Sequence, residues 1–580
     1  MEEQVPDGGE YDAIVVGLGP VGAMCAGLLC GRGCRVLVLE QTPSESLARP
    51  RAIAMDADGM RLLQQLGLLE AFLADADPGR GGQFITPEGR FLNGFLPQEG
   101  QGRPGAWTGG SVEFPESPQG TPGSVFFYQP RLEELLRQSL KRWGDRCTIA
   151  FGAKLVGFEE GADSVTARLQ RSSAEWKRLP TGEVAIVERA GSEKEPCWEV
   201  HAQYLIGCDG SKSVVSRELN AEAPSRHTDL DFDEEWCVVD AMLLDESAVG
   251  RELPYMTVQI CDKARKVTYM TGSWVTDRPQ RGRHIRWEFE VLRDDDREQV
   301  ASHKWLQDSF LSRWLVPSQY ELIRSAVYRF HSVLARQWCS VEHGRVFLAG
   351  DAAHQNPPFN GQGLTGGFRD VANLSWKLVM ALKRPALRSL LLRTYQEERY
   401  PHMHDAVLAS VETGKLIQTF CDAKAEDLDA VIKENATRGY GRLGEETRRT
   451  VGLFAFGSGL AGEPCPQPSL HGRPLDTLLG QGFALLLNSA APLTQELPEA
   501  PLAPLELVVL RLSREELAGQ SSADLAMGAL LRKYGAVLVR PDRLIYGAVR
   551  IGEPPGAVMG LLGRLREQLG LQPPAPLSRL

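Results

Sequence analysis

The chain has 580 residues and a formal net charge of −11, with 43% hydrophobic and 24% charged residues. This composition is ordinary for a globular protein of about three to four domain-sized units. The negative charge argues against nucleic acid or an anionic membrane as the main partner, because both select for basic surface. The eleven cysteines contain no CxxC pair, which favours a reduced, cytoplasmic compartment over a disulfide or zinc framework.

Residues 13–31 carry no charge and could be mistaken for a signal peptide or a membrane span. Acidic residues precede this segment where a signal peptide requires positive charge. Glycines and a proline also interrupt it near its middle, and no other stretch is long and apolar enough to cross a bilayer. We therefore expect no membrane partner.

A dinucleotide-binding turn is predicted near the N-terminus. An apolar strand over residues 12–16 leads into GLGPVG at residues 17–22, then into a small-residue helix and a second strand over residues 35–39. This is the context that a GxGxxG motif requires, because its glycines permit a tight turn, a close approach to pyrophosphate and close helix–strand packing. An acid at the end of the second strand can bind a ribose diol. The predicted cofactor contacts here are Gly17, Gly19, Pro20, Val21, Gly22, Glu40 and Gln41.

A second motif much later in the chain favours a flavin over a nicotinamide as the resident cofactor. An apolar strand over residues 346–349 leads to Gly350 and Asp351, at the strand end where ligands bind in open α/β sheets. Asp351 could hold the hydroxyls of a ribityl chain. The loop PPFNGQG over residues 357–363 then precedes a predicted helix, whose first N–H groups would stabilise the negative charge of a reduced flavin.

These segments resemble the group A flavoprotein aromatic hydroxylases. The likeness is closest to the 3-(3-hydroxyphenyl)propanoate hydroxylases within that family, and it is strong to about residue 410 and looser afterwards. It rests on the Gly350-Asp351 turn with its loop, on residues 370–378 and 208–211, and on shorter matches at residues 49–52, 129–133, 286–289 and 540–543.

The resemblance implies an FAD-dependent monooxygenase that uses NADH or NADPH and O2 to hydroxylate a small phenol, through an oxygen adduct at flavin C4a. The substrate would be a meta-substituted phenol with an acidic side chain or, alternatively, a polyketide-type phenol. The cofactor contacts that the resemblance implies are Arg49, Arg51, Gln129, Asp209, Gly210, Gly350, Asp351, Pro358, Gly361, Gln362, Gly363 and Leu364.

Phenol deprotonation would raise the nucleophilicity of the ring, so a hydrogen-bond acceptor is expected near the hydroxyl. The predicted substrate sheet offers Tyr255, Gln259, Tyr269 and His284, each of which could instead be a packing residue. The candidate catalytic residues are Tyr269 and His284, together with Pro358 beside the reactive edge of the flavin.

Several charged residues have two interpretations. Arg286 could pair with a substrate carboxylate, or it could face solvent on its strand. His354 lacks neighbours with metal-ligand spacing, so we expect a structural hydrogen bond in its loop and no metal site. Glu133 and Glu134 are expected on a solvated helix face.

The predicted fold is α/β, with a Rossmann-like FAD-binding domain, an inserted β-sheet substrate domain and a C-terminal thioredoxin-like domain. The FAD-binding domain takes residues 1–225, with a loop insertion at 81–124, and residues 335–410. The substrate-binding sheet takes residues 226–334, and a helical segment and linker take residues 411–469. Residues 470–580 would form the thioredoxin-like domain, which lacks a CxxC motif and could serve packing or a homodimer.

Other functions on the same scaffold remain open. The chain could be a flavin-dependent reductase or a halogenase, although the Trp-x-Trp-x-Ile signature expected of a halogenase is absent. A non-catalytic flavin-binding redox sensor is the alternative from a different class.

Overall fold

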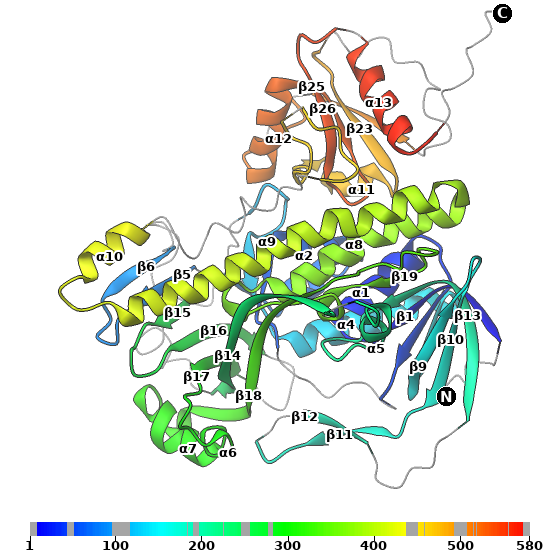
Figure 1. The fold of residues 1–580 in the computed structure, drawn as a ribbon. Coiled ribbons are helices and arrows are strands. Elements are labelled where there is room, and N and C mark those ends of the chain that lie inside the picture. The colour runs from blue at the N-terminus through cyan, green and yellow to red at the C-terminus, as the bar shows by residue number, and fades with distance from the viewer. Residues whose placement is uncertain are drawn as a thin grey trace, which may run out of the picture.

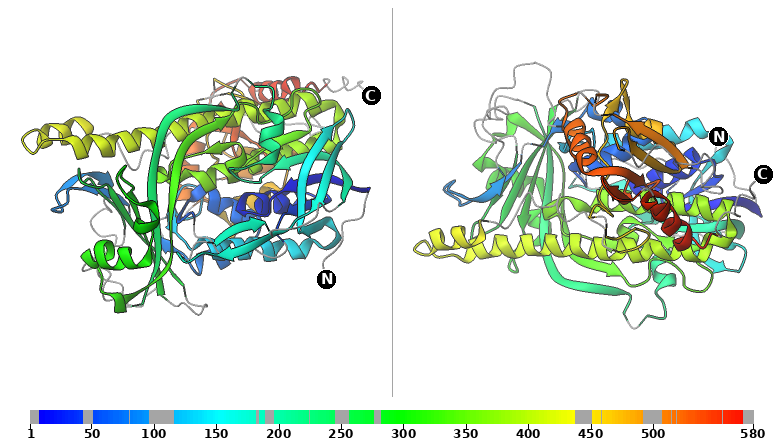
Figure 2. Two further views of the ribbon diagram at one scale, coloured as in Figure 1. Left: turned by 60° about the horizontal axis from the view of Figure 1, so that its bottom comes forward. Right: turned by 90° about the horizontal axis from the view of Figure 1, so that it is seen from above.

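The computed structural model comprises two large sheets, a long helix pair and a smaller C-terminal unit (Figure 1). Figure 2 shows the long helix α9 (Arg388–Asp422), in yellow-green, running the length of the molecule and extending past it at one end. The structure describes residues 8–42, 51–79, 81–95, 116–181, 184–188, 196–223, 225–244, 256–275, 282–436, 451–457, 459–491, 507–513, 515–517, 519–554 and 556–571.

The first sheet has the predicted Rossmann-like core. Within the described residues, seven strands run in the order β8-β2-β1-β13-β10-β9, with β19 also paired to β13. The central strands are parallel, whereas β9 and β10 extend the sheet antiparallel to β13. The strands are β1 (Gly9–Val16), β2 (Val36–Glu40), β8 (Cys147–Phe151), β9 (Ala153–Glu160), β10 (Val165–Arg171), β13 (Cys197–Gly207) and β19 (Val346–Leu348).

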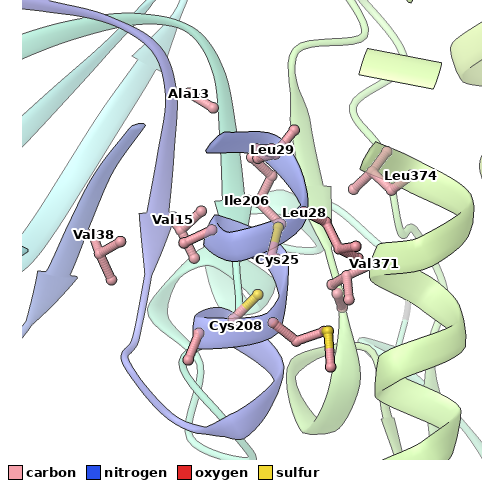
Figure 3. Packing of buried hydrophobic residues seen from close by; sticks show 14 of the residues in the cluster. Ala13, Val15, Cys25, Leu28, Leu29, Val38, Ile206, Cys208, Val371 and Leu374 are labelled. Carbon is pink, nitrogen blue, oxygen red and sulfur yellow. The ribbon is translucent and has the colours of Figure 1, made fainter. Parts of the chain in front are cut away.

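Helix α1 (Pro20–Gly31) lies between this sheet and helix α8 (Gln362–Lys383). Figure 3 shows Cys25, Leu28 and Leu29 of α1 packed toward the sheet on one side and toward Val371 and Leu374 of α8 on the other. All five side chains are buried. Because α1 is covered on both sides, its sequence is apolar all round and lacks the polar stripe of a surface helix. The same helix that presents the GxGxxG turn is therefore fixed inside the main core.

The second sheet follows the order β20-β18-β14-β17-β16-β15-β5-β6 in the part of the chain that is described. Its apolar face packs against the short helices α6 (Arg297–Val300) and α7 (His303–Trp305) and the residues that follow them, around Trp287 and Phe310. The strands are β5 (Gly82–Ile85), β6 (Phe91–Phe95), β14 (His227–Leu243), β15 (Thr257–Ile260), β16 (Val267–Val275), β17 (Gly282–Glu290), β18 (Tyr320–Ala335) and β20 (His354–Gln355).

Strands β5 and β6 correct one sequence expectation, since residues 81–124 were expected to form a loop. Residues 82–95 instead form a hairpin whose β5 pairs in parallel with β15. Phe84 is fully buried against Phe420 of α9, and this packing stabilises the hairpin. Residues 96–115 of the predicted loop lie outside the described residues.

Smaller elements complete this part of the chain. A further hairpin consists of β11 (Ala174–Arg178) paired antiparallel with β12 (Val184–Glu188). The other elements are a small sheet of β3 (Ala54–Asp56), β4 (Asp77–Pro78) and β7 (Ser124–Phe126), with helices α2 (Ala57–Gln65), α3 (Leu69–Leu73), α4 (Gln129–Leu140), α5 (Val214–Leu219) and α10 (Leu428–Asn435).

The C-terminal unit contains a sheet of order β24-β23-β25-β26, in which β23 and β24 are parallel and the other pairs are antiparallel. Trp376 of α8 and Leu391 of α9 belong to the same buried cluster as Phe483 and Tyr546 of this unit. The elements are β21 (Ser469–Leu470), β22 (Arg473–Pro474), α11 (Leu475–Leu479), β23 (Phe483–Asn488), β24 (Leu507–Leu512), α12 (Ser522–Lys533), β25 (Tyr534–Val539), β26 (Ile545–Arg550) and α13 (Ala557–Gln568).

Within the described ranges, no helix combines the length and apolar character that a bilayer span requires, and no cluster of His, Cys, Asp and Glu has the composition of a metal site. All eleven cysteines are free thiols.

Candidate active site

A cavity of about 580 Å³ opens between the two sheets. Its walls come from segments far apart in the sequence: the GxGxxG turn, the residues of the second predicted motif, and the inner face of the second sheet. The residues that line it are Gly19, Pro20, Val21, Arg51, Ala52, Ile53, Ala54, Gly79, Gly81, Gly82, Ser124, Phe126, Gln129, Cys208, Gly210, Thr257, Thr268, Met270, Arg286, Glu288, Ala349, Asp351, Asn356, Pro358, Phe359, Asn360, Gly361, Gly363 and Leu364.

The three glycines of the first turn have distinct roles. Gly17 has a φ of +99°, and a Cβ there would lie 2.6 Å from the carbonyl oxygen of Cys208. A Cβ at Gly22 would lie 2.0 Å from the carbonyl oxygen of Gly17. Both positions therefore require glycine for the fold itself. Gly19, by contrast, lines the cavity and has nothing within 4 Å of its Cβ direction, so its space is open to a ligand.

Glu40 ends β2 beside this turn. Its carboxylate accepts hydrogen bonds from Leu18 N (3.2 Å) and from Thr42 N (3.0 Å), which fixes its position near the phosphate turn. A carboxylate held in this way keeps lone pairs that could accept from a ribose diol. Gln41 is exposed and does not line the cavity.

Asp370 of α8 holds the second motif in place. Its Oδ2 accepts from Gly350 N (3.0 Å) and lies 2.7 Å from His354 Nε2, while Arg399 Nε donates to Oδ1 (2.9 Å). Burial opposes ionisation of Asp370, but the charges of His354 and Arg399 outweigh burial and hold its pKa below the usual value. The structural role predicted for His354 is confirmed. Asp351, one residue past the fixed Gly350, stays exposed at the cavity.

Two helix N-termini open on the same cavity. Neither α1 nor α8 has a side-chain cap or an acidic residue in its first turn, so their first N–H groups are left for a ligand. At α8 the helix begins at Gln362, and Gly361, Gly363 and Leu364 line the cavity. Gln362 does not line it, because its side chain accepts from Arg369 Nη1 (2.8 Å). The positive ends of both helix dipoles suit a ligand with two anionic groups.

Gln129, the first residue of α4, connects the cavity wall to a buried ion pair. Its Oε1 accepts from the backbone N–H groups of Arg51 (3.0 Å) and Ala52 (2.5 Å), and its Nε2 donates to Glu133 (2.7 Å). Arg137 in turn donates to Glu133 (3.1 Å). The expectation that Glu133 lies on a solvated face is therefore wrong: it is 7% exposed, and Gln129 and Arg137 satisfy its charge.

Residues 208–210 contribute backbone to the cavity at Cys208 and Gly210. Asp209 points away to the start of α5, where its Oδ2 accepts from Val214 N (2.8 Å). Burial raises the pKa of Asp209, and its Oδ1 is buried with no hydrogen-bond partner among the described residues. Asp209 thus positions the segment, while Gly210 offers the open surface.

The second sheet presents alternate residues to the cavity, as strand geometry requires. On β16, Thr268 and Met270 line the cavity, whereas Tyr269 points to the apolar side and packs on Trp314. Burial raises the pKa of the Tyr269 hydroxyl above its usual value. His284 on β17 is fully buried, its Nε2 lies 2.8 Å from Asp240, and it does not line the cavity. The structure thus separates these two candidates from the cavity.

Pro358, the remaining catalytic candidate, does line the cavity together with Phe359 and Asn360. Arg49 and Tyr255 lie outside the described residues.

Asp240 is the centre of a buried charge cluster behind the cavity wall. Arg286 Nε donates to its Oδ1 and Arg324 Nε to its Oδ2, both at 2.8 Å. Arg286 also donates to the carbonyl oxygen of Arg51. The solvent-facing interpretation of Arg286 is wrong, because the residue is 2% exposed and lines the cavity.

Glu288 and Asn356 are two of the lining residues that were missed from the sequence. Glu288 follows Arg286 on the same face of β17, and Asn356 precedes the Pro-Pro loop. Both side-chain heteroatoms of Asn356 are buried without a partner among the described residues, as expected of groups that await a ligand. Strand alternation around Trp287 could have indicated Glu288, but no sequence signal distinguishes Asn356 from an ordinary loop asparagine.

Residues 10–410 match a family model described as "FAD binding domain". The chain belongs to this family. FAD is therefore its cofactor, and the open glycine surfaces, the two uncapped helix N-termini and the unpartnered Asn356 fit such a group.

Among curated relatives, the chain is 31% identical over 427 residues to a "Probable NADH-specific resorcinol 4-hydroxylase" of Rhodococcus jostii (strain RHA1), covering 72% of this chain and 68% of that protein. It is also 31% identical over 405 residues to a 3-(3-hydroxy-phenyl)propionate/3-hydroxycinnamic acid hydroxylase of Escherichia coli O139:H28, covering 70% of this chain. The match spans 62% of that second relative's length. The predicted membership of the aromatic hydroxylase family is confirmed.

Solved structures share the fold over nearly the whole chain. The flavin-dependent monooxygenase PieE, in complex with FAD and substrate, gives a TM-score of 0.73 at 20% identity, covering 97% of this chain and 99% of that chain. A ternary complex of aklavinone-11 hydroxylase with FAD and aklavinone gives a TM-score of 0.69 at 23% identity, covering 97% of this chain and 100% of that chain. The α/β fold of a flavin hydroxylase is thereby confirmed.

Proposed function

We propose that this chain is an FAD-dependent monooxygenase that hydroxylates a small phenol with NADH or NADPH and O2. One observation carries the proposal: a single cavity is shared by the phosphate turn, the ring-binding loop and the inner face of the second sheet. A cofactor bound along the phosphate turn and the ring-binding loop would therefore present its ring to a substrate held against the second sheet. Family membership supports the same activity.

The residues that would hold FAD come from both motifs. Glu40 would bind the adenosine ribose, the N-terminus of α1 the pyrophosphate, and Asp351 the ribityl chain. The backbone of residues 361–363 at the start of α8 would hold the flavin ring, with Pro358 beside it. When bound, FAD supplies the oxygen-transfer chemistry, and the chain orients the substrate ring and excludes water.

The domain scheme is part of the proposal. The second sheet would be an inserted substrate domain, because its polar face forms the far wall of the cavity. The parallel β23–β24 pair, the antiparallel β25–β26 pair and the closing helix α13 agree with a thioredoxin-like C-terminal domain. Burial raises the pKa of Cys465 to about 12, so this cysteine is poorly suited to disulfide exchange.

Both curated relatives act, by their names, on phenols: resorcinol in one case and 3-(3-hydroxy-phenyl)propionate in the other. A phenol with an acidic side chain and a polyketide-type phenol both remain candidate substrates here. A homodimer and a cytoplasmic location also remain predictions.

The test is oxidation of NADH and NADPH by the purified, FAD-loaded chain in the presence of a panel of phenols. Faster oxidation with a phenol, together with one atom of ¹⁸O from ¹⁸O2 in the product, supports a hydroxylase. Yellow protein with no substrate-stimulated oxidation would instead support a flavin-binding sensor. A product that requires halide would support a halogenase.

A further inference from the structure

Glu288 is a buried acid that faces the cavity. It is 5% exposed and lines the cavity on β17, whereas its neighbours Trp287 and Phe289 belong to the apolar cluster on the opposite face of the sheet. A carboxylate in such a position normally has a hydrogen-bond partner, because burying an unsatisfied charge is costly.

The neighbours of Glu288 leave its carboxylate available. Val238 on β14 and Thr268 on β16 lie directly opposite it in the register of the sheet. Val238 is apolar, and the Thr268 hydroxyl donates to Gln259 instead. Among the described residues, no hydrogen bond to Glu288 is found.

Arg286 forms a long ion pair with Glu288, but the 3.8 Å between its Nη1 and Oε1 is too long for a hydrogen bond. That guanidinium is already held by Asp240 and by the Arg51 carbonyl. Other acids of the same sheet are satisfied differently: Lys266 pairs with both Glu234 (3.0 Å) and Glu290 (3.2 Å). Glu288 therefore stands out as an acid whose missing hydrogen-bond partner would come from a bound molecule.

We propose that Glu288 accepts the proton of the substrate hydroxyl, and that the cavity selects phenols that enter without charge. This inference rests on the proposed function. In the step, the phenol O–H bond breaks, a new O–H bond forms on the Glu288 carboxylate, and the electron pair stays on the phenolate oxygen. Arg286 lies close enough to stabilise the charge at its new position. Because the negative charge only moves from Glu288 to the phenolate, the total charge of the cavity does not change and no additional charge is buried.

The electrostatics of the surroundings favour this role. Burial raises the pKa of Glu288, and Asp240 raises it further, while Arg286 and Arg324 act in the opposite direction without outweighing burial. Thr268, which faces it from β16, carries no charge. A raised pKa makes the carboxylate a stronger base toward a phenol.

The same arrangement disfavours an acidic substrate at this end of the cavity. A carboxylate there would be repelled by ionised Glu288, and the nearby Arg286 is already engaged by Asp240. We therefore expect kcat/KM for resorcinol to exceed that for 3-(3-hydroxyphenyl)propanoate by at least about tenfold.

The test is the pH profile of kcat/KM for resorcinol in the FAD-loaded protein and three variants. In the wild type, kcat/KM should rise with pH through the raised pKa of Glu288 and then level off. E288Q should lose about 100-fold or more near neutral pH and recover as the pH approaches the pKa of the phenol itself, about 10. E288D should keep the acid limb with reduced activity. E290Q, on the same strand but paired with Lys266 outside the cavity, should follow the wild type.

Three outcomes would contradict the inference. An E288Q variant with wild-type kcat/KM and pH profile would exclude Glu288 as the base, while hydroxylation by the wild type would leave the proposed function standing. A preference for 3-(3-hydroxyphenyl)propanoate would exclude selection of uncharged phenols. If E288Q fails to bind FAD, the pH profile of E288D is decisive. A kcat/KM for E288D that does not fall at acidic pH would equally exclude the proposal. No turnover of any phenol by the wild type would instead overturn the proposed function.

Discussion

Arg61 of α2 and Asp476 of α11 form a buried bidentate ion pair, with Nε–Oδ2 at 2.8 Å and Nη2–Oδ1 at 2.7 Å. The two residues are 415 positions apart, and Arg61 also donates to the Cys465 carbonyl (2.7 Å). This buried guanidinium therefore connects α2 to the C-terminal unit.

Removing the charge of Arg61 should destabilise the whole chain. R61M leaves the buried Asp476 with the more distant Arg543 (3.3 Å) as its cationic partner, so we expect a loss of about 3 kcal/mol in the free energy of unfolding. The measurement is urea unfolding followed by flavin and tryptophan fluorescence. R90M is the matched control, because Arg90 and Asp429 pair at the surface and should contribute less than about 1 kcal/mol. Equal effects of the two variants would contradict this prediction.

Two glycine substitutions should separate cofactor binding from folding. G19V places a side chain in open cavity space, so the apoprotein should melt as the wild type does while FAD affinity falls at least about tenfold. G22A meets the Gly17 carbonyl oxygen 2.0 Å away and should cost about 1–3 kcal/mol in stability. Thermal melts of the apoproteins and titration with FAD measure the two effects. The interpretation fails if G19V binds FAD normally.

Gln129 should affect the cofactor through the loop that it holds. Q129L removes the acceptor for the N–H groups of Arg51 and Ala52, so we expect FAD to bind about five- to tenfold more weakly, as for the loss of one or two hydrogen bonds. Q138L, on the same helix but at the exposed surface, is the control. Fluorescence titration of the apoproteins with FAD would show the difference, and equal affinities would exclude a positioning role for Gln129.

Asp240 should make the free energy of unfolding depend on pH in the acidic range. Burial raises the pKa of this carboxyl, but Arg286 and Arg324 together outweigh burial and hold it well below its ordinary value. Because the pKa is lowered on folding, the contribution to stability is complete above about pH 4 and is lost as the pH falls through the lowered value. D240N should be less stable than the wild type at pH 7, by about 3–5 kcal/mol, and should lose less stability between pH 5 and pH 3. D429N, which removes the charge of an exposed ion pair, should match the wild type in stability. If D240N and the wild type lose equal stability between pH 5 and pH 3, the prediction is wrong.

The sequence predicted those parts of the fold and site that depend on local geometry. The turn over residues 17–22 is recognisable because Gly17 and Gly22 answer short-range steric demands, and Gly361 of the later loop adopts a φ of +63° that favours glycine. Tyr269 and His284 were predicted from their residue types, but whether a residue lines the cavity depends on its position and contacts in the sheet. Tyr269 falls on the apolar face of its strand, and His284 is engaged by Asp240.

Long-range pairing accounts for what was missed. Glu133 was expected at the surface because its partners could not be inferred, yet Gln129 and Arg137 satisfy it inside the protein. The segment 540–543 was noticed only as a resemblance. In the structure Arg540 donates to Glu398 (2.8 Å), a contact across 142 positions that composition and periodicity cannot reveal.

Glu398 of α9 also lies 3.1 Å from Lys377 of α8, and all three charged side chains of this cluster are fully buried. A chain cut after α9 would leave a carboxylate without its guanidinium and would bare Trp376 to water. The C-terminal unit is thus not an appendage that can be trimmed to obtain a minimal enzyme. Anyone building chimaeras between relatives should move the crossover upstream of α8, so that both sides of this contact are inherited from the same parent.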